Sequence, residues 1–255
     1  MRPACWTSEW PRSVSLSTDE TVALSIGRPY VLALAGSVLI DLLLRLQIFY
    51  YYSTQHYEFN IPLNTVRDFL QIFYAALLLA FFYLIFFFWL SNLRRQRQAI
   101  RRKLLRLIGL VASLQLVTNI ISVNITIYRL HIESYELLAE SLALYVAINL
   151  VFVFWYWYWD YPLKNNLINH RLSAYIPQGI LFPEEQIEDR VLKSDNWIPG
   201  PVDYFYFTIL SSNCFGSPEG HMLIGNQLKT LQIIHTLSMI LVFIIIVARA
   251  INTLN

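Results

Sequence analysis

The chain has 255 residues, of which 56% are hydrophobic and only 14% are charged, with a formal net charge of +2. An ordinary globular domain carries about a quarter charged residues, and a disordered or nucleic-acid-binding chain needs more charge still. These classes are therefore excluded, as is a disulfide scaffold, because Cys5 and Cys214 are the only cysteines, and the composition favours a chain that folds in a lipid bilayer.

Apolar windows long enough to cross a bilayer occur five times. A hydrocarbon core about 30 Å thick needs roughly 20 residues of helix. The windows are residues 30–51, 69–90, 107–128, 137–159 and 230–251, and all ten prolines fall outside them. Proline disrupts a helix interior, so its exclusion supports the assignment. We therefore predict an all-α fold, a polytopic membrane helix bundle of about five transmembrane helices.

The windows divide the chain into four parts. Residues 1–29 are a polar N-terminal tail, and we expect no signal peptide because the first apolar run is too long and begins too late. Residues 30–159 form a four-helix membrane region, residues 160–202 a polar acidic loop, and residues 203–255 a short apolar segment followed by the final transmembrane helix.

The first window contains two charged residues. Asp41 and Arg45 lie one helical turn apart, so their side chains share a face and can pair. Ionisable groups at this depth are costly, and they mark a buried partner, a water-filled cavity or an ion path. We interpret the two residues as an intramembrane ion pair that neutralises itself.

A basic loop, residues 94–106, separates the second and third windows. It has seven basic residues and no acid in thirteen positions. Short loops rich in Lys and Arg stay on the cytoplasmic side, which predicts that the N-terminus and residues 160–229 lie inside. The basic residues are not interleaved with apolar ones, so a solvated linker, or one that binds anionic lipid headgroups, is favoured over a voltage sensor.

The third and fourth windows carry two further patterns. A stripe of polar residues in the third window is predicted to face other helices and form hydrogen bonds with them. Its members are Gln115, Asn119, Ser122 and Thr126. The fourth window ends in the aromatic run 154–161, and aromatic rings with polar tips collect at headgroup level. This run is predicted to be an interface belt.

The segment before the last window is too short to cross a bilayer. The run from Tyr204 to Leu210 is about two turns of helix, which can enter the membrane and turn back. Non-helical backbone can follow it at that depth only when protein or water surrounds it. We therefore predict a re-entrant, pore-helix-like segment before the last helix, and for His235 in that helix a helix-packing hydrogen bond rather than a proton relay.

This section, residues 199–254, resembles the pore helix, filter and inner helix of the two-helix potassium-channel pore. Placed on the family's Thr-Thr-Val-Gly-Tyr-Gly, Ser211–Gly216 keeps hydroxyls at the first two positions, an aromatic at the fifth and glycine at the sixth. Asn213, Cys214 and the following Ser217 depart from the family pattern. The resemblance implies an ion-channel-like protein, monovalent cations and a homo-oligomer, with pore residues Thr208, Ser211, Ser212, Asn213, Cys214, Phe215 and Gly216.

The C-terminal half is also similar to a family of uncharacterised bacterial multi-pass integral-membrane proteins. The residues that carry this resemblance are Phe182-Pro183, the run Asp203–Phe207 with Thr208, and His235, Ser238, Ala248, Ile251 and Asn252 in the last helix. A basic loop before the third helix is part of the same pattern. The resemblance implies a multi-pass protein of a cell membrane, the bacterial inner membrane, and it carries no activity.

The sequence also bears on three alternatives to a channel: a non-conducting membrane protein, an enzyme and a metal-binding protein. A non-conducting membrane protein, acting as a scaffold, a lipid-binding protein or part of a complex, is the alternative to a channel. An enzyme is not expected, since no acid–base pair and no nucleophile with an evident partner occurs. Four residues are metal ligands by type but lack any recognised spacing, so we expect neither a metal nor a cofactor. They are Cys214, Glu219, His221 and His235.

Overall fold

A computed structural model describes residues 19–54, 61–93, 98–127, 134–169, 179–186, 197–214 and 216–254. These residues form six α-helices, which are α1 (Asp19–Thr54), α2 (Ile61–Leu93), α3 (Gln98–Ile127), α4 (Ser134–Asn169), α5 (Pro201–Cys214) and α6 (Asn226–Leu254). Two short strands, β1 (Gly179–Leu181) and β2 (Met222–Ile224), pair antiparallel with Ile180 opposite Leu223, and a 3-10 turn, η1 (Pro183–Glu185), follows β1.

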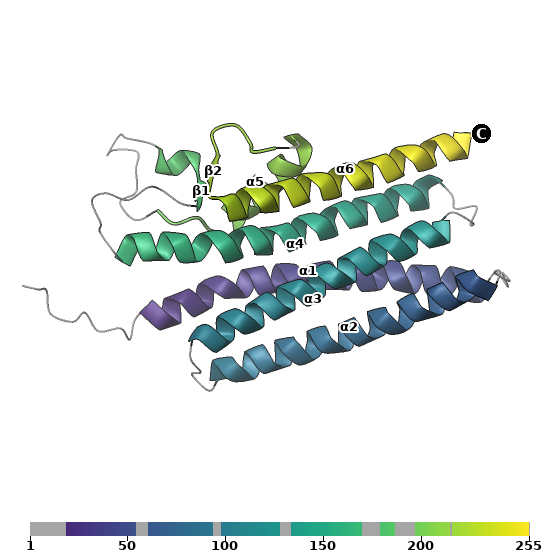
Figure 1. Ribbon diagram of the computed structural model, residues 1–255, viewed down its shortest axis with the longest axis horizontal. Coiled ribbons are helices and arrows are strands. Elements are labelled where there is room, and N and C mark those ends of the chain that lie inside the picture. Colours follow the sequence, from purple (N-terminus) through teal and green to yellow (C-terminus); the bar gives the residue numbers. More distant parts are fainter. Residues whose placement is uncertain are drawn as a thin grey trace, which may run out of the picture.

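The five long helices lie side by side in one bundle (Figure 1). Helices α1, α3 and α6 run in one direction, and α2 and α4 run in the opposite one. Each contains a stretch that is long and apolar enough to cross a membrane, at residues 27–46, 68–90, 100–122, 138–161 and 226–244. The predicted all-α polytopic bundle is confirmed, and the chain is a multi-pass membrane protein.

The helices are longer than the apolar windows that predict them. α1 begins at Asp19, inside the predicted tail, and continues through Pro29. α3 begins at Gln98, so residues 98–106 of the predicted basic loop are helical, while residues 94–97 lie outside the described part of the chain. α4 continues to Asn169, into the predicted acidic loop. Hydropathy marks only the lipid-embedded part of a helix, whereas backbone hydrogen bonding extends the helix into the interface.

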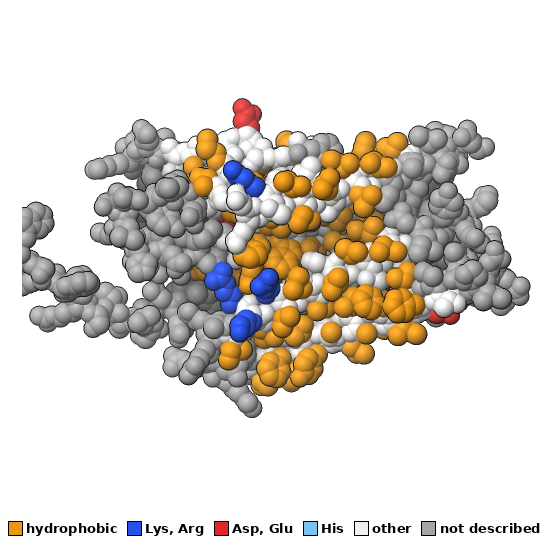
Figure 2. All heavy atoms as spheres, viewed as in Figure 1, with side chains coloured by type: hydrophobic (Ala, Val, Ile, Leu, Met, Phe, Trp, Pro, Cys, Tyr) orange, Lys and Arg blue, Asp and Glu red, His pale blue; other side chains and the backbone are white. Residues whose placement is uncertain are grey.

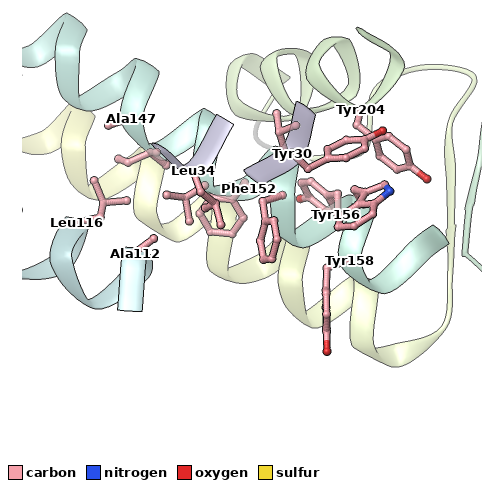
Figure 3. Packing of buried hydrophobic residues seen from close by; sticks show 14 of the residues in the cluster. Tyr30, Leu34, Ala112, Leu116, Ala147, Phe152, Tyr156, Tyr158 and Tyr204 are labelled. Atoms are coloured by element: carbon pink, nitrogen blue, oxygen red, sulfur yellow. The ribbon is translucent and has the colours of Figure 1, made fainter. Parts of the chain in front are cut away.

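Helix α4 lies at the centre of the bundle and packs against α1, α3, α5 and α6. Most of its aromatic run is buried between helices at the end of the membrane-length stretch, instead of facing outward as a headgroup belt would. Phe154 and Tyr156 are fully buried, and the ring of Trp157 stacks on Tyr30 of α1 with centroids 4.4 Å apart. Figure 3 shows Tyr30, Tyr156 and Tyr204 gathered on one side of α4 while Tyr158 points away from them.

The outer surface of the bundle is apolar over most of its length (Figure 2). Helix α2, which packs chiefly against α3, is the most exposed span, with Ile72 and Leu79 each 72% exposed. Such a surface is stable in lipid and would aggregate in water. The exposed basic residues of the described chain lie near the starts of α1, α3 and α6, which share one end of the bundle; they are Arg28, Arg102, Lys103, Arg106 and Lys229.

This basic end of the bundle is expected to face the cytoplasm. A single cysteine at Gln186, which is exposed beside η1 at this end, should react with an impermeant thiol reagent only after the cells are lysed. A cysteine at Thr65, exposed in the first turns of α2 at the opposite end, should react in intact cells. Both variants need a background free of Cys5 and Cys214. The reverse labelling pattern would overturn the charge-based orientation.

Candidate functional site

Helix α5 packs on one side of the bundle against α4 and α6, and the chain then returns to the end at which α5 began (Figure 1). Near the start of α5, the Tyr204 hydroxyl donates to Oδ2 of Asp160 over 2.5 Å. Near its end, Oγ of Ser212 lies 3.1 Å from the hydroxyl of Tyr145. Tyr145 and Asp160 both belong to the membrane-length stretch of α4 and are separated by ~22 Å along the helix axis. The predicted short helix before the last span is therefore observed, and it runs along α4 from the level of Asp160 to that of Tyr145.

Local sequence explains where α5 begins and which face it buries. Pro201 occupies the first helical position, where its missing N–H is harmless, and Oδ2 of Asp203 accepts a 2.7 Å hydrogen bond from the Gly200 N–H. The buried face contains Tyr204, Phe207, Thr208, Ser211 and Ser212, a spacing of three and four residues. Three of these five side chains are Thr or Ser, which are common where helices pack closely in a membrane.

The carboxylate of Asp160 fixes the start of α5 against α4. Asp160, fully buried at the end of the α4 span, accepts the Tyr204 hydroxyl at Oδ2 and the Ile180 backbone N–H at Oδ1, the latter over 2.6 Å. Burial raises the pKa of Tyr204 well above its ordinary value, and the adjacent Asp160 carboxylate raises it further. Tyr204 is therefore a permanent donor, and Asp160 joins α4, β1 and α5. Sequence reasoning missed this role, although Asp160 is an isolated acid within an aromatic run.

Polar side chains occur where α4 packs against α5 and α6. On α4 the residues at positions 145, 149, 156 and 160 share one face. We call the set the polar seam, and its members are Tyr145, Asn149 and Tyr156 of α4, Thr208, Ser211, Ser212 and Asn213 of α5, and Gln232 and His235 of α6. The structure thus gathers most of the predicted pore residues, together with His235, on one side of α4.

Hydrogen bonds connect the helices at two levels of the seam. The Tyr145 hydroxyl donates to Oδ1 of Asn213 over 3.0 Å. The Tyr156 hydroxyl donates to Oε1 of Gln232 over 2.8 Å and lies 3.3 Å from Nδ1 of His235. The His235 ring also stacks on Phe152 with centroids 4.2 Å apart. This is the helix-packing contact that the sequence predicts for His235.

Several buried atoms of the seam have no hydrogen-bond partner within the described part of the chain. They are Oδ1 of Asn149, Oγ of Ser211, Nε2 of Gln232 and Nε2 of His235. A buried polar atom without a partner costs free energy, and buried polar groups in native proteins are almost always satisfied by protein, water or ligand. At membrane depth such groups are typical of an ion or substrate pathway.

The filter-like residues adopt a conformation different from that of the potassium-channel filter. Ser211–Cys214 form the last turn of α5 rather than an extended strand of carbonyls, and Gly216 belongs to the returning chain. Phe215 lies outside the described residues. The physical reason is that an extended filter relies on glycine at alternate positions, whereas Asn213 and Cys214 carry side chains that the helical region accommodates.

Asp41 and Arg45 are placed in the α1–α3 interface, away from α5. Oδ1 of Asp41 accepts a 3.1 Å hydrogen bond from the Asn119 amide. Arg45 donates to the Thr118 carbonyl over 3.3 Å, and its guanidinium lies 4.6 Å from the centre of the Tyr74 ring. Among the described residues the two charged side chains form no direct ion pair, so the predicted pair is replaced by contacts that each makes with other helices.

The predicted polar stripe of the third window does face other helices, but among its described side chains only Asn119 forms a predicted interhelical hydrogen bond. Gln115 and Asn119 are fully buried and Ser122 is nearly so, whereas the side chain of Thr126 lies outside the described set. No group of three His, Cys, Asp or Glu side chains is positioned to hold a metal ion in the described ranges, and the Cys214 thiol is free and exposed. Comparison of the chain with models of known protein families, with curated proteins and with solved structures finds no match.

Proposed function

We propose that this membrane protein conducts a small monovalent cation along the polar seam. The observation that carries the proposal is the re-entrant helix α5, whose C-terminal turn ends beside polar side chains in the membrane-length stretch of α4, with Asn213 and Cys214 exposed. Helices that stop at membrane depth, with polar groups around the break, are typical of ion and substrate sites in channels and transporters. This fits the implied cation channel even though the filter itself is not extended.

The C-terminal turn of α5 supplies the electrostatic reason for a cation. The last four carbonyl groups of an α-helix have no intrahelical donor, and together they carry roughly half a negative charge. In α5 these carbonyls belong to Ser211–Cys214, the stretch that resembles the filter. A cation near this turn would therefore meet backbone oxygens, as in a potassium channel, but from a helix end rather than from an extended strand.

Side chains of the seam supply further oxygen ligands at the same level. Ser212 and Asn213 are connected through the Tyr145 hydroxyl, and Asn149 lies one helical turn from Tyr145. Oδ1 of Asn149 and Oγ of Ser211 are buried without a partner among the described residues. Neutral oxygens in this number favour a weakly held, partly dehydrated cation, which is what conduction requires.

Flux through the purified protein in proteoliposomes tests the proposal. We expect uptake of Na⁺ or K⁺ above that of protein-free vesicles, and about tenfold slower uptake for Asn213→Leu, which removes an oxygen beside the helix end. In a Cys5→Ser background, a cationic thiol reagent on the exposed Cys214 should block flux more strongly than an anionic one, because it places positive charge at the end of α5.

Two serine substitutions provide the matched control. Ser212→Ala removes a seam hydroxyl, whereas Ser238→Ala removes a hydroxyl of α6 that donates to its own helix at the Ile234 carbonyl over 2.8 Å. Only the former should slow uptake. Flux equal to that of empty vesicles, in protein that elutes as a folded species, would contradict conduction and favour the non-conducting scaffold or lipid-binding alternative.

A further inference from the structure

A second cluster of buried polar side chains lies between α1 and α3, two helices that contribute no residue to the polar seam. The hydrogen bond from Asn119 to Asp41 joins the two helices at its centre. Ser37 lies one turn before Asp41, Gln115 lies one turn before Asn119, and Ser122 lies one turn after it. Because α1 and α3 run in the same direction, these neighbours meet at matching levels.

The Asp41 carboxylate is only half satisfied. Asp41 is fully buried, and its Oδ2 has no hydrogen-bond partner in the described chain. Arg45 is close enough in sequence to reach it, but its guanidinium is held by the Thr118 carbonyl and by the face of the Tyr74 ring. Arg45 therefore acts on the carboxylate through its charge alone, and Oδ2, a buried oxygen that is expensive to leave unpaired, still lacks a partner among the described residues that contacts it directly.

Further buried oxygen atoms without a partner in the described chain belong to residues within one helical turn of Asp41 or Asn119, and Nε2 of Gln115 lacks a partner there as well. Within the described residues these oxygen atoms are Oγ of Ser37, Oε1 of Gln115, Oδ1 of Asn119 and Oγ of Ser122. All four side chains are at least nine-tenths buried, and each lies within one helical turn of the Asp41–Asn119 hydrogen bond. One carboxylate with several neutral amide and hydroxyl oxygens is the ligand set that hard cations prefer.

The geometry points to a monovalent cation site between α1 and α3, centred on Asp41 and completed by amide and hydroxyl oxygens of Ser37, Gln115, Asn119 and Ser122. Arg45 sets the charge of this site. With the guanidinium held on Thr118 and Tyr74, a bound monovalent cation brings the net charge of Asp41, Arg45 and the ion to +1, so the charge of Arg45 limits affinity and excludes divalent ions. The site does not depend on conduction through the seam.

Cation-dependent thermal unfolding of the purified protein tests the site directly. The protein is melted in NaCl, KCl or LiCl and in choline chloride at equal ionic strength, and Tm is followed against cation concentration. A ligand that binds the folded state alone raises Tm in a saturable way. We expect such a rise with at least one of the three metal ions and none with choline.

Four variants separate binding from general stability. Asp41→Asn should abolish the saturable rise, while Asp68→Asn, an exposed aspartate on α2, should keep it. Ser37→Ala removes one ligand with little change in packing and should raise the half-saturating concentration about tenfold. Arg45→Gln should lower the half-saturating concentration, because the positive charge that repels the cation is removed. If Asp41 had only a structural role, Ser37→Ala and Arg45→Gln would not shift this concentration in opposite directions.

Several results would contradict a cation site at Asp41. Identical Tm values in all four salts, or a rise that Asp41→Asn retains, would overturn the site. A Tm that follows pH but no metal ion would assign a proton to Oδ2 and would equally overturn it. If Asp41→Asn does not fold, the Ser37→Ala and Arg45→Gln shifts decide alone. Absence of flux in proteoliposomes would leave this result untouched, so the two proposals fail separately.

Discussion

Replacing Asp160 by alanine should lower the free energy of unfolding by about 3–5 kcal/mol, the range for removing one partner of a buried charged contact. The substitution leaves two buried donors without an acceptor, the Tyr204 hydroxyl and the Ile180 N–H. It also releases the only carboxylate that joins α4 to both β1 and α5 within the described residues. We therefore expect α5 to lose its position beside α4 as well as the protein to lose stability.

Graded variants at the same contact make the expectation specific. Tyr204→Phe removes one of the two hydrogen bonds and should cost about 1.5–3 kcal/mol. Asp160→Asn keeps the shape and one acceptor and should fall between alanine and wild type. Denaturant titration in detergent micelles, followed by tryptophan fluorescence, measures all three. An Asp160→Ala protein as stable as Tyr204→Phe would show that the Ile180 contact contributes nothing.

A Gly109→Ala substitution is expected to cost about 1–3 kcal/mol by overpacking the contact between α3 and α4. A Cβ at this position would overlap the Phe154 ring and would lie 3.1 Å from the Trp155 ring. Phe154 is fully buried, and Trp155 is held by a 3.0 Å hydrogen bond to Oγ of Ser113. Neither ring can move aside, so the two helices must separate. Small residues allow this close approach in membrane bundles.

Gly36→Ala is the matched control for this prediction. Gly36 also lies in a helix packed on α4, but a Cβ there would meet only the end of the Leu150 side chain at 3.5 Å, an ordinary contact. Alanine is the better helix former by ~1 kcal/mol, so Gly36→Ala should be neutral or stabilising. Thermal unfolding monitored by size-exclusion chromatography compares the two. Equal Tm losses would mean that the α3–α4 contact is looser than the structure indicates.

Sequence reasoning located the five spans because lipid imposes a single strong requirement on each. A spanning helix needs about 20 apolar residues, and only five windows satisfy this. The polar residues at 115, 119 and 122 were correctly assigned to an interior face because helical periodicity alone places them together. The re-entrant segment was also predictable, since Tyr204–Leu210 is apolar but too short to cross.

The sequence alone does not predict which side chains of neighbouring helices contact each other. Asp41 and Arg45 are one turn apart, which predicts a pair, yet Asn119, Thr118 and Tyr74 on neighbouring helices take both side chains. The aromatic run 154–161 has the composition of a headgroup belt, and most of it is buried because α5 and strand β1 cover that end of α4. Neither the contacts of Asp41 and Arg45 nor the burial of the aromatic run can be predicted from the neighbouring residues in the sequence.

The amino-acid sequence by itself therefore determined that the protein folds in a lipid bilayer, how many spans it has, and that a short apolar segment precedes the last span. These features depend on hydrophobicity and length, which are local properties of the sequence. Only the tertiary structure decided what each polar residue does. Asp160 became the anchor of α5, and Asp41 became the centre of an oxygen-lined site, because a side chain's role in lipid depends on which distant groups its helix is packed against.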